Sequence, residues 1–168
     1  MKKLLAFILV IACALSLASC GALGGKDYKK ADKTFEFKGF EITLTEAFRR
    51  TGSVYDIVDY ESTSETSVTV IRLAYSDYSG LSQTSAYEYA KIYSDEMESM
   101  AETSTVRTID GMVAVESETE ALGFEFTSLS FVYKGTDALW VVDFMCDLED
   151  FDEYEEYFVK WAKTAVVP

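Results

Sequence analysis

Residues 124–147, FEFTSLSFVYKGTDALWVVDFMCD, decide the fold. Aromatic and β-branched residues dominate both halves of this stretch, and such residues favour strands. Between the halves, Lys134-Gly135-Thr136-Asp137 has the composition of a turn. The stretch therefore predicts two long antiparallel strands, 124–133 and 138–146, joined by this turn.

The preceding residues predict a second hairpin of the same sheet. Asp110-Gly111 separates the strand-like segments 105–109 and 112–118, and Asp-Gly between strands is a strong hairpin signal. Together the two hairpins predict a four-stranded antiparallel meander. Further strands are expected nearer the N-terminus, at 34–37, 40–44, 54–60 and 67–75, with a break at Gly39.

Two helices are predicted from capping signals and from apolar residues at helical spacing. Ser85 precedes Glu88 by three residues, which is the spacing of a capping box, and Asp150 precedes Glu153 in the same way. We expect each helix to pack one apolar face on the sheet. These faces comprise Ala86, Ala90, Tyr93, Met97 and Met100 in the first helix and Phe151, Tyr154, Phe158, Trp161 and Ala165 in the second.

The order of these elements predicts an α+β fold. We expect an antiparallel sheet of about six strands, with one mid-chain helix and one C-terminal helix packed on it. The chain has 168 residues, of which 49% are hydrophobic, so its size and composition suit one packed domain. Residues 34–168 are expected to form that domain.

The N-terminal residues predict export from the cytoplasm. Lys2 and Lys3 precede the apolar run 4–17, which suits a signal peptide and is shorter than the roughly 20 apolar residues of a spanning helix. Residues 17–21, Leu-Ala-Ser-Cys-Gly, resemble the lipobox of bacterial lipoproteins. The resemblance implies that residues 1–19 are removed and that Cys20 carries diacylglycerol as a thioether. It also implies an extracytoplasmic protein on the outer face of the cytoplasmic membrane, or on the outer membrane of a two-membrane host.

Charge is divided unevenly along the remaining chain. Residues 20–33 are expected to form the lipidated N-terminus and a flexible tether that contains Lys26, Lys29, Lys30 and Lys33. Residues 34–168 carry 9 basic and 27 acidic side chains. An anionic bilayer would attract the tether and repel the domain, which predicts a domain held off the membrane surface. The competing interpretation is that the tether is an ordinary solvated linker.

Composition also excludes several classes of function. Acidic residues outnumber basic ones by 29 to 15, so nucleic acid is not expected as a partner. The chain contains no histidine, which excludes Ser-His and Cys-His nucleophile pairs and His-ligated metal sites. Cys13 would leave with the signal peptide and Cys20 would carry lipid, so Cys146 is the remaining thiol. We expect Cys146 to be buried as a small apolar side chain, and we predict no cofactor.

The order of elements resembles the PsbP-like α/β/α sandwich. Three stretches carry this resemblance: residues 37–44 (FKGFEITL), Ile109-Asp110-Gly111 before the meander, and residues 158–162 (FVKWA) of the closing helix. The resemblance covers about residues 34–168 and implies a non-catalytic domain used in binding or assembly. No functional residue of that family maps onto this chain by motif.

Tyrosines beside acidic residues indicate a candidate binding surface. Tyrosine is favoured at interfaces because it combines a large contact area with a polar tip. We predict that an envelope protein or a small ligand binds through Tyr55, Asp56, Asp59, Tyr60, Tyr75, Asp77 and Tyr78. The competing interpretation is that these are ordinary edge and turn residues.

Two other functions stay open. Without histidine, catalysis would depend on Asp and Glu, as in an envelope hydrolase that cleaves glycan with a carboxyl pair. Alternatively, oxygen ligands could hold Ca²⁺ or Mg²⁺. The acidic run 147–156 lacks the D-x-[DN]-x-[DN]-G spacing of a calcium loop. Neither alternative has a spaced motif, which favours the binding module.

Overall fold

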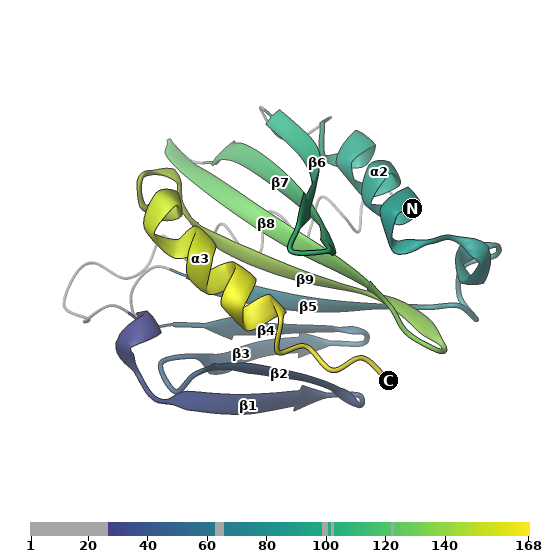
Figure 1. Cartoon of the computed structure of the whole chain (residues 1–168), viewed down its shortest axis with the longest axis horizontal. Coiled ribbons are helices and arrows are strands. Elements are labelled where there is room, and N and C mark those ends of the chain that lie inside the picture. Colours follow the sequence, from purple (N-terminus) through teal and green to yellow (C-terminus); the bar gives the residue numbers. More distant parts are fainter. Residues whose placement is uncertain (1–26, 63–65, 99–100, 102, 122) are drawn as a thin grey trace.

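The computed structural model describes residues 27–62, 66–98, 101, 103–121 and 123–168 (Figure 1). The expected signal peptide, Cys20, Lys26 and Met100 lie outside the described residues. The strands are β1 (Asp32–Phe37), β2 (Phe40–Thr45), β3 (Arg49–Val54), β4 (Ile57–Glu61), β5 (Ser67–Ala74), β6 (Thr103–Ile109), β7 (Met112–Ala121), β8 (Phe124–Lys134) and β9 (Ala138–Asp147). The helices are α2 (Ala86–Met97), α3 (Phe151–Ala162) and the short 3-10 helices η1 (Asp27–Lys29), η2 (Leu81–Gln83) and η3 (Leu148–Asp150).

Seven strands form one antiparallel sheet in the order β3-β4-β5-β9-β8-β7-β6, and β1 and β2 pair as a separate two-stranded sheet. The α+β class and the meander β6–β9 are confirmed. Asp110 and Gly111 form the β6–β7 turn with φ values of 50° and 83°, a left-handed pair that Asp-Gly accommodates at low cost. The turn predicted at residues 134–137 joins β8 to β9.

The single strand expected at 54–60 is wrong. β3 ends at Val54, the chain reverses through Tyr55 and Asp56, and β4 begins at Ile57. Tyr55 supplies the reversal with φ at 53°, although neither turn residue is glycine, asparagine or proline. β3 itself is polar and mostly exposed, so its sequence has no apolar alternation that would indicate a strand.

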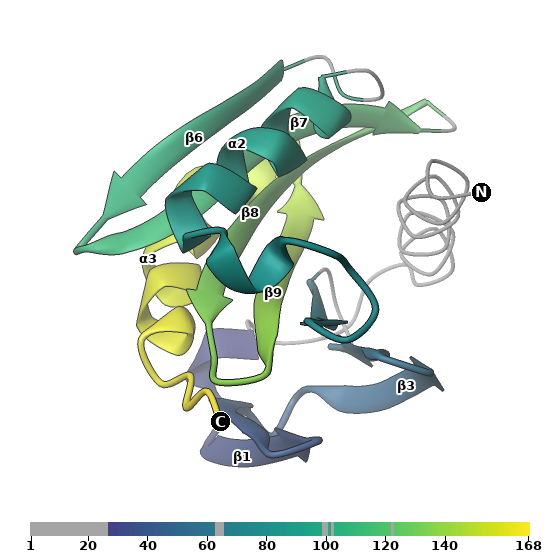
Figure 2. The ribbon, with the colours of Figure 1, turned by 90° about the vertical axis from the view of Figure 1, so that its right-hand side faces the viewer.

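The two α-helices cover opposite faces of the large sheet. Val142 and Phe144 of β9 belong to the core beneath α3, whereas Val141 of the same strand packs with Ala90 of α2. The small sheet lies on the α3 side, where Phe40 of β2 stacks on Trp140 at 5.2 Å between ring centroids. Figure 2 shows α2 over β6–β8 and the small sheet at the other end of the molecule. The resulting layers place one buried aromatic core between α3, the small sheet and the large sheet.

The helix starts agree with the sequence in one case and differ in the other. Ser85 and Glu88 form the predicted capping box of α2, with the Glu88 amide donating to the Ser85 hydroxyl at 3.2 Å. Asp150 makes no side-chain cap on α3, so that part of the prediction is wrong. The 3-10 helix η3 leads directly into α3, and Asp150 therefore already has helical dihedral angles.

Burial agrees with the predicted helix faces as far as the helices extend, but α3 ends at Ala162, so the expectation that Ala165 belongs to its face is wrong. Tyr154, Phe158 and Trp161 are at most 2% exposed, and Cys146 is fully buried as expected. After α3 the chain passes β2, where Val166 and Glu41 exchange backbone hydrogen bonds of 2.9 and 3.0 Å. Within the part of the chain that the structure describes, no helix is long and apolar enough to cross a membrane.

Candidate functional site

Several turns meet at one end of the large sheet. We call this end the turn rim and define it by the β1–β2 turn, the β3–β4 turn, residues 75–80 after β5, and the β8–β9 turn. In Figure 1 these segments lie toward the right, where the C-terminus also lies. The Thr136 amide donates to the Pro168 carbonyl at 2.9 Å, and the Tyr75 amide donates to the Asp137 carbonyl at 2.9 Å, so backbone bonds join the segments. The turn rim brings together predicted residues that are up to 23 positions apart in the sequence.

Ion pairs join three of the turns of the turn rim to β5. Arg72 of β5 donates to Asp137 at 2.6 Å and to Asp56 at 3.3 Å, and Lys38 donates to Asp56 at 2.6 Å. The Lys38 hydrogen bond, followed by the Arg72 contacts, holds the pKa of Asp56 below its usual value despite partial burial. The hydrogen bond to Asp137 likewise raises the pKa of Arg72. Asp56 is therefore ionised, and its carboxylate is held in place by Lys38 of the β1–β2 turn and Arg72 of β5.

Tyr55 projects from this supported turn. Its side chain is 90% exposed, and Val54 beside it is 62% exposed. A bulky residue with φ at 53° is uncommon, and such a conformation persists only where the surrounding structure enforces it. Here the Arg72 amide donates to the Asp56 carbonyl at 2.8 Å, which fixes the turn on the next strand. The structure therefore presents an aromatic ring to solvent on a rigid base.

The second tyrosine segment begins where β5 ends. The Tyr75 hydroxyl donates to the Gly135 carbonyl at 3.0 Å, and partial burial followed by the Asp137 charge raises the pKa of Tyr75. Asp77 is exposed, and its side chain accepts a hydrogen bond from Ser76 at 2.8 Å. Tyr78 is partly buried. Thus Tyr55, Asp56, Tyr75, Asp77 and Tyr78 belong to the turn rim.

The other two predicted residues lie elsewhere. Tyr60 is 2% exposed and packs against Phe35 of β1 at 4.9 Å between ring centroids, so its predicted exposure is wrong. The physical reason is strand alternation, because Tyr60 points to the side of the sheet that β1 covers. Asp59 points to the opposite side, where it accepts a hydrogen bond from Thr69 at 2.9 Å.

Asp59 belongs to a polar row across the face that carries α2. The strand register places Asp59 beside Thr69, Thr69 beside Asp143, and Asp143 beside Ser130. Ser130 donates to Asp143 at 2.5 Å. Burial nevertheless raises the pKa of Asp143 from 3.8 to about 6, since an ionised carboxylate loses hydration there. Sequence reasoning missed this acid because it lies within the apolar run 138–146.

Asp143 should make the stability of the protein depend on pH. Its pKa is higher in the folded chain than in the unfolded chain, so stability should fall as pH rises from about 4 to above 6. We expect the Asp143→Asn substitution to remove this fall. At pH 8 the free energy of unfolding of the variant should be higher than that of the parent protein by on the order of 2 kcal/mol, and at pH 4 the two should differ little. Urea denaturation at both pH values measures this, with Asp95→Asn on exposed α2 as the control. A less stable Asp143→Asn protein at pH 8 would contradict the assignment.

Two hollows of the described residues lie away from the turn rim. One, of about 850 Å³, runs along α3 and includes Tyr28, Glu153 and Tyr157. The other, of about 390 Å³, lies between the β7–β8 turn and η3 and includes Asp147. Burial, followed by the charges of Asp150 and Glu149, raises the pKa of Asp147. Both hollows are lined by several carboxylates. Among the described residues, no group of three or more acidic or cysteine side chains is placed to hold a metal ion.

Sequence reasoning missed the ion pairs that join the segments of the turn rim. Lys38 and Asp137 both lie in segments predicted as turns, but their ion pairs depend on which turns meet. Arg72 lies in an apolar strand between Ile71 and Leu73, and a charge in that position was the one available signal.

The comparisons with solved structures agree with the observed fold. The layers described above define a PsbP-like α+β sandwich. Solved structures with this architecture include cyanobacterial PsbP (CyanoP) from Synechocystis sp. PCC 6803, which is 17% identical, covers 91% of this chain and 99% of its own, and has a TM-score of 0.55. The Ran-binding protein Mog1p of Saccharomyces cerevisiae is 12% identical, with coverage of 83% and 96% and a TM-score of 0.54. No family model and no curated protein matches the sequence. Identities this low show a shared fold alone.

Proposed function

We propose that this protein is a membrane-anchored extracytoplasmic lipoprotein whose domain binds another envelope protein through the turn rim, without catalysing a reaction. The observation that carries the binding proposal is Tyr55, an aromatic side chain 90% exposed on a turn that ion pairs hold in place. Large aromatic anchors on rigid supports contribute most of the energy at many protein interfaces. The lipobox-like residues 17–21 support the anchor.

Geometry favours a protein partner over a small ligand. Small ligands usually bind in concave, largely apolar pockets. Tyr55 and Val54 instead project outward, while the two hollows described above lie along α3 and beside η3. A rim with an outward-facing aromatic ring and mixed charges suits insertion into a partner's groove.

Crosslinking at Tyr55 tests the binding proposal. We expect a photoreactive amino acid at position 55 of the lipoprotein, expressed in its own host, to yield a discrete crosslinked product. The matched control is the same substitution at Phe124, which is 53% exposed at the start of β8 and therefore lies at the opposite end of that strand from the turn rim. The product should also disappear when Cys20→Ala releases the protein from the membrane. Equal crosslinking at positions 55 and 124 would contradict a partner site at the turn rim.

A further inference from the structure

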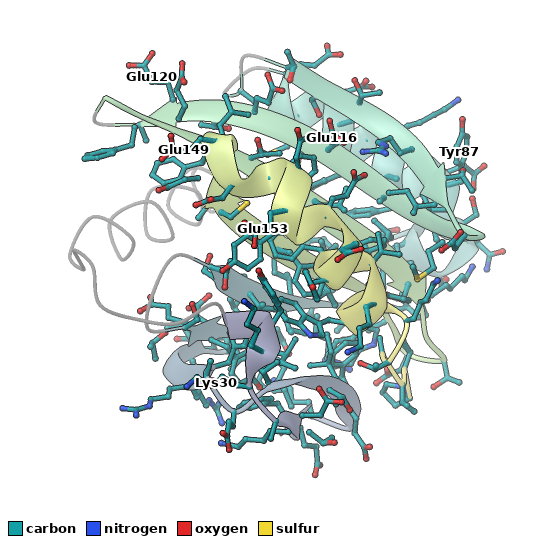
Figure 3. The ribbon with its side chains drawn as sticks, turned by 60° about the vertical axis from the view of Figure 1, so that its left-hand side comes forward. Lys30, Tyr87, Glu116, Glu120, Glu149 and Glu153 are labelled. Carbon is teal, nitrogen blue, oxygen red and sulfur yellow. The ribbon has the colours of Figure 1, made fainter. Side chains whose placement is uncertain are left out.

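The charge of the chain is separated in space as well as in sequence. Residues 26–54 contain seven basic and five acidic side chains, a net charge of +2, whereas residues 55–168 contain six basic and 24 acidic side chains, a net charge of −18. The first group comprises η1, the small sheet and β3. In Figure 3, Lys30 lies low on the small-sheet side, and Glu120 and Glu149 lie at the opposite side of the molecule.

Five exposed bases gather at one end of the first group, which we call the basic end: Lys29, Lys30, Lys33, Arg49 and Arg50. The Glu46 amide donates to the Ala31 carbonyl at 2.7 Å, so the start of β1 lies beside the residues that lead into β3. The Lys33 ammonium lies 4.7 Å from the Phe35 ring, and Phe35 packs on Tyr60, the strand partner of Arg50. These contacts place Lys33 and Arg50 at the same end of the small sheet and β3.

These bases differ from those elsewhere in the protein. Arg72, Arg107 and Lys163 each form an ion pair with a carboxylate. The five bases of the basic end form no ion pair with any other part of the described chain. The acids Asp32, Glu46 and Glu61 also lie at this end, and Glu153 of α3 accepts the hydrogen bond of Tyr28 beside Lys29, so the five bases only slightly exceed the acids there. The strong asymmetry comes from the −18 of the remaining chain.

The N-terminal segment brings this end close to the proposed lipid. Tyr28 stacks on Tyr157 at 4.0 Å between ring centroids, meets Tyr154 edge-on at 5.8 Å, and donates to Glu153. The described chain is thus held on α3 from Tyr28 onward. Seven residue steps separate Cys20 from Asp27, which reach at most about 25 Å. The turn rim lies at the other end of β3, beyond Val54.

We infer that the basic end lies against the headgroups of anionic phospholipids and that the turn rim faces away from the membrane. This inference rests on the proposed lipid anchor. A negative surface attracts the basic end, and it repels the side of the molecule on which Glu120 and Glu149 lie, across from Lys30 (Figure 3). The sequence alone predicts a domain held off the membrane, because it sums all charges of residues 34–168 together. The inferred orientation differs because the fold places Arg49 and Arg50 beside the tether.

An anchored protein on vesicles tests the orientation independently of lipidation in the cell. The chain starting at Cys20 is coupled through that thiol to a maleimide lipid, since Cys146 is fully buried. The vesicles contain phosphatidylcholine alone or phosphatidylcholine with phosphatidylglycerol. We expect an amine-reactive label to modify Lys33 roughly fivefold more slowly on the anionic vesicles. Each base near such a surface favours contact with the headgroups by about fivefold, and contact shields the amine from the label. Lys91 on α2 should react equally on both, and about 0.5 M salt should abolish the difference.

Charge reversal separates the domain surface from the tether. Arg49→Glu with Arg50→Glu should remove the protection of Lys33, whereas Lys91→Glu with Lys160→Glu makes the same charge change elsewhere and should retain it. All four positions are exposed, and circular dichroism checks the fold of each variant. Protection of Lys33 that survives Arg49→Glu with Arg50→Glu would overturn the inference, as would equal labelling on both vesicles. Because the anchor is chemical, neither result bears on whether the cell lipidates Cys20.

Discussion

Replacing Phe144 by alanine is expected to lower the free energy of unfolding by about 3–5 kcal/mol. Phe144 lies in β9 and is fully buried. Its ring centroid is 5.2 Å from that of Phe158, 6.0 Å from that of Phe131 and 6.2 Å from that of Trp161. The side chain therefore joins the centre of the large sheet to α3, and its removal leaves a cavity that neighbouring rings cannot readily fill. Urea denaturation of the mature chain measures the loss.

Phe124→Ala is the matched control, because it removes the same side chain from a surface position. Phe124 begins β8 and is 53% exposed. Its replacement should change the free energy of unfolding by no more than about 0.5 kcal/mol. Similar losses for Phe144→Ala and Phe124→Ala would contradict the assignment of the core to the interface between β9 and α3.

Cys20→Ala is expected to release the protein from the membrane into the soluble extracytoplasmic fraction. Acyl chains contribute about 0.8 kcal/mol per buried CH₂ group, and two chains hold a protein stably where one does not. The described part of the chain offers no spanning helix that would replace them. Fractionation of cells followed by detection of the protein measures the shift from membrane to soluble fraction.

Cys13→Ala controls for changes to the N-terminal region in general. Cys13 lies in the apolar run that would be removed, so its replacement should leave the protein on the membrane. Retention of Cys20→Ala on the membrane would contradict lipid anchoring at this residue. Release of Cys13→Ala to the same extent would instead attribute the effect to impaired export.

Local sequence signals predicted the elements whose geometry is local. Asp110-Gly111 and the four residues 134–137 indicate their turns through residue types that accept turn conformations. The capping box at Ser85 is equally local. The β3–β4 turn escaped because Tyr55 adopts a left-handed conformation that its residue type does not favour. Packing beyond the sequence window also makes β1 and β2 a separate sheet.

The candidate site was predictable only in part for the same reason. The tyrosine-and-acid pattern identified Tyr55, Asp56 and Tyr75, which the fold gathers at the turn rim. It could not separate Tyr55, which is 90% exposed, from Tyr60, which is 2% exposed, because strand pairing decides which face each residue occupies. The supporting partners Lys38 and Arg72 likewise depend on contacts between distant turns and strands.

Mass spectrometry of the N-terminal fragment of the native protein tests the proposed lipoprotein most directly. We predict a fragment that begins at Cys20 and carries diacylglycerol bound to the cysteine sulfur. A fragment that retains residues 1–19, or one that shows Cys20 with an unmodified thiol, would contradict membrane anchoring and the envelope function built on it.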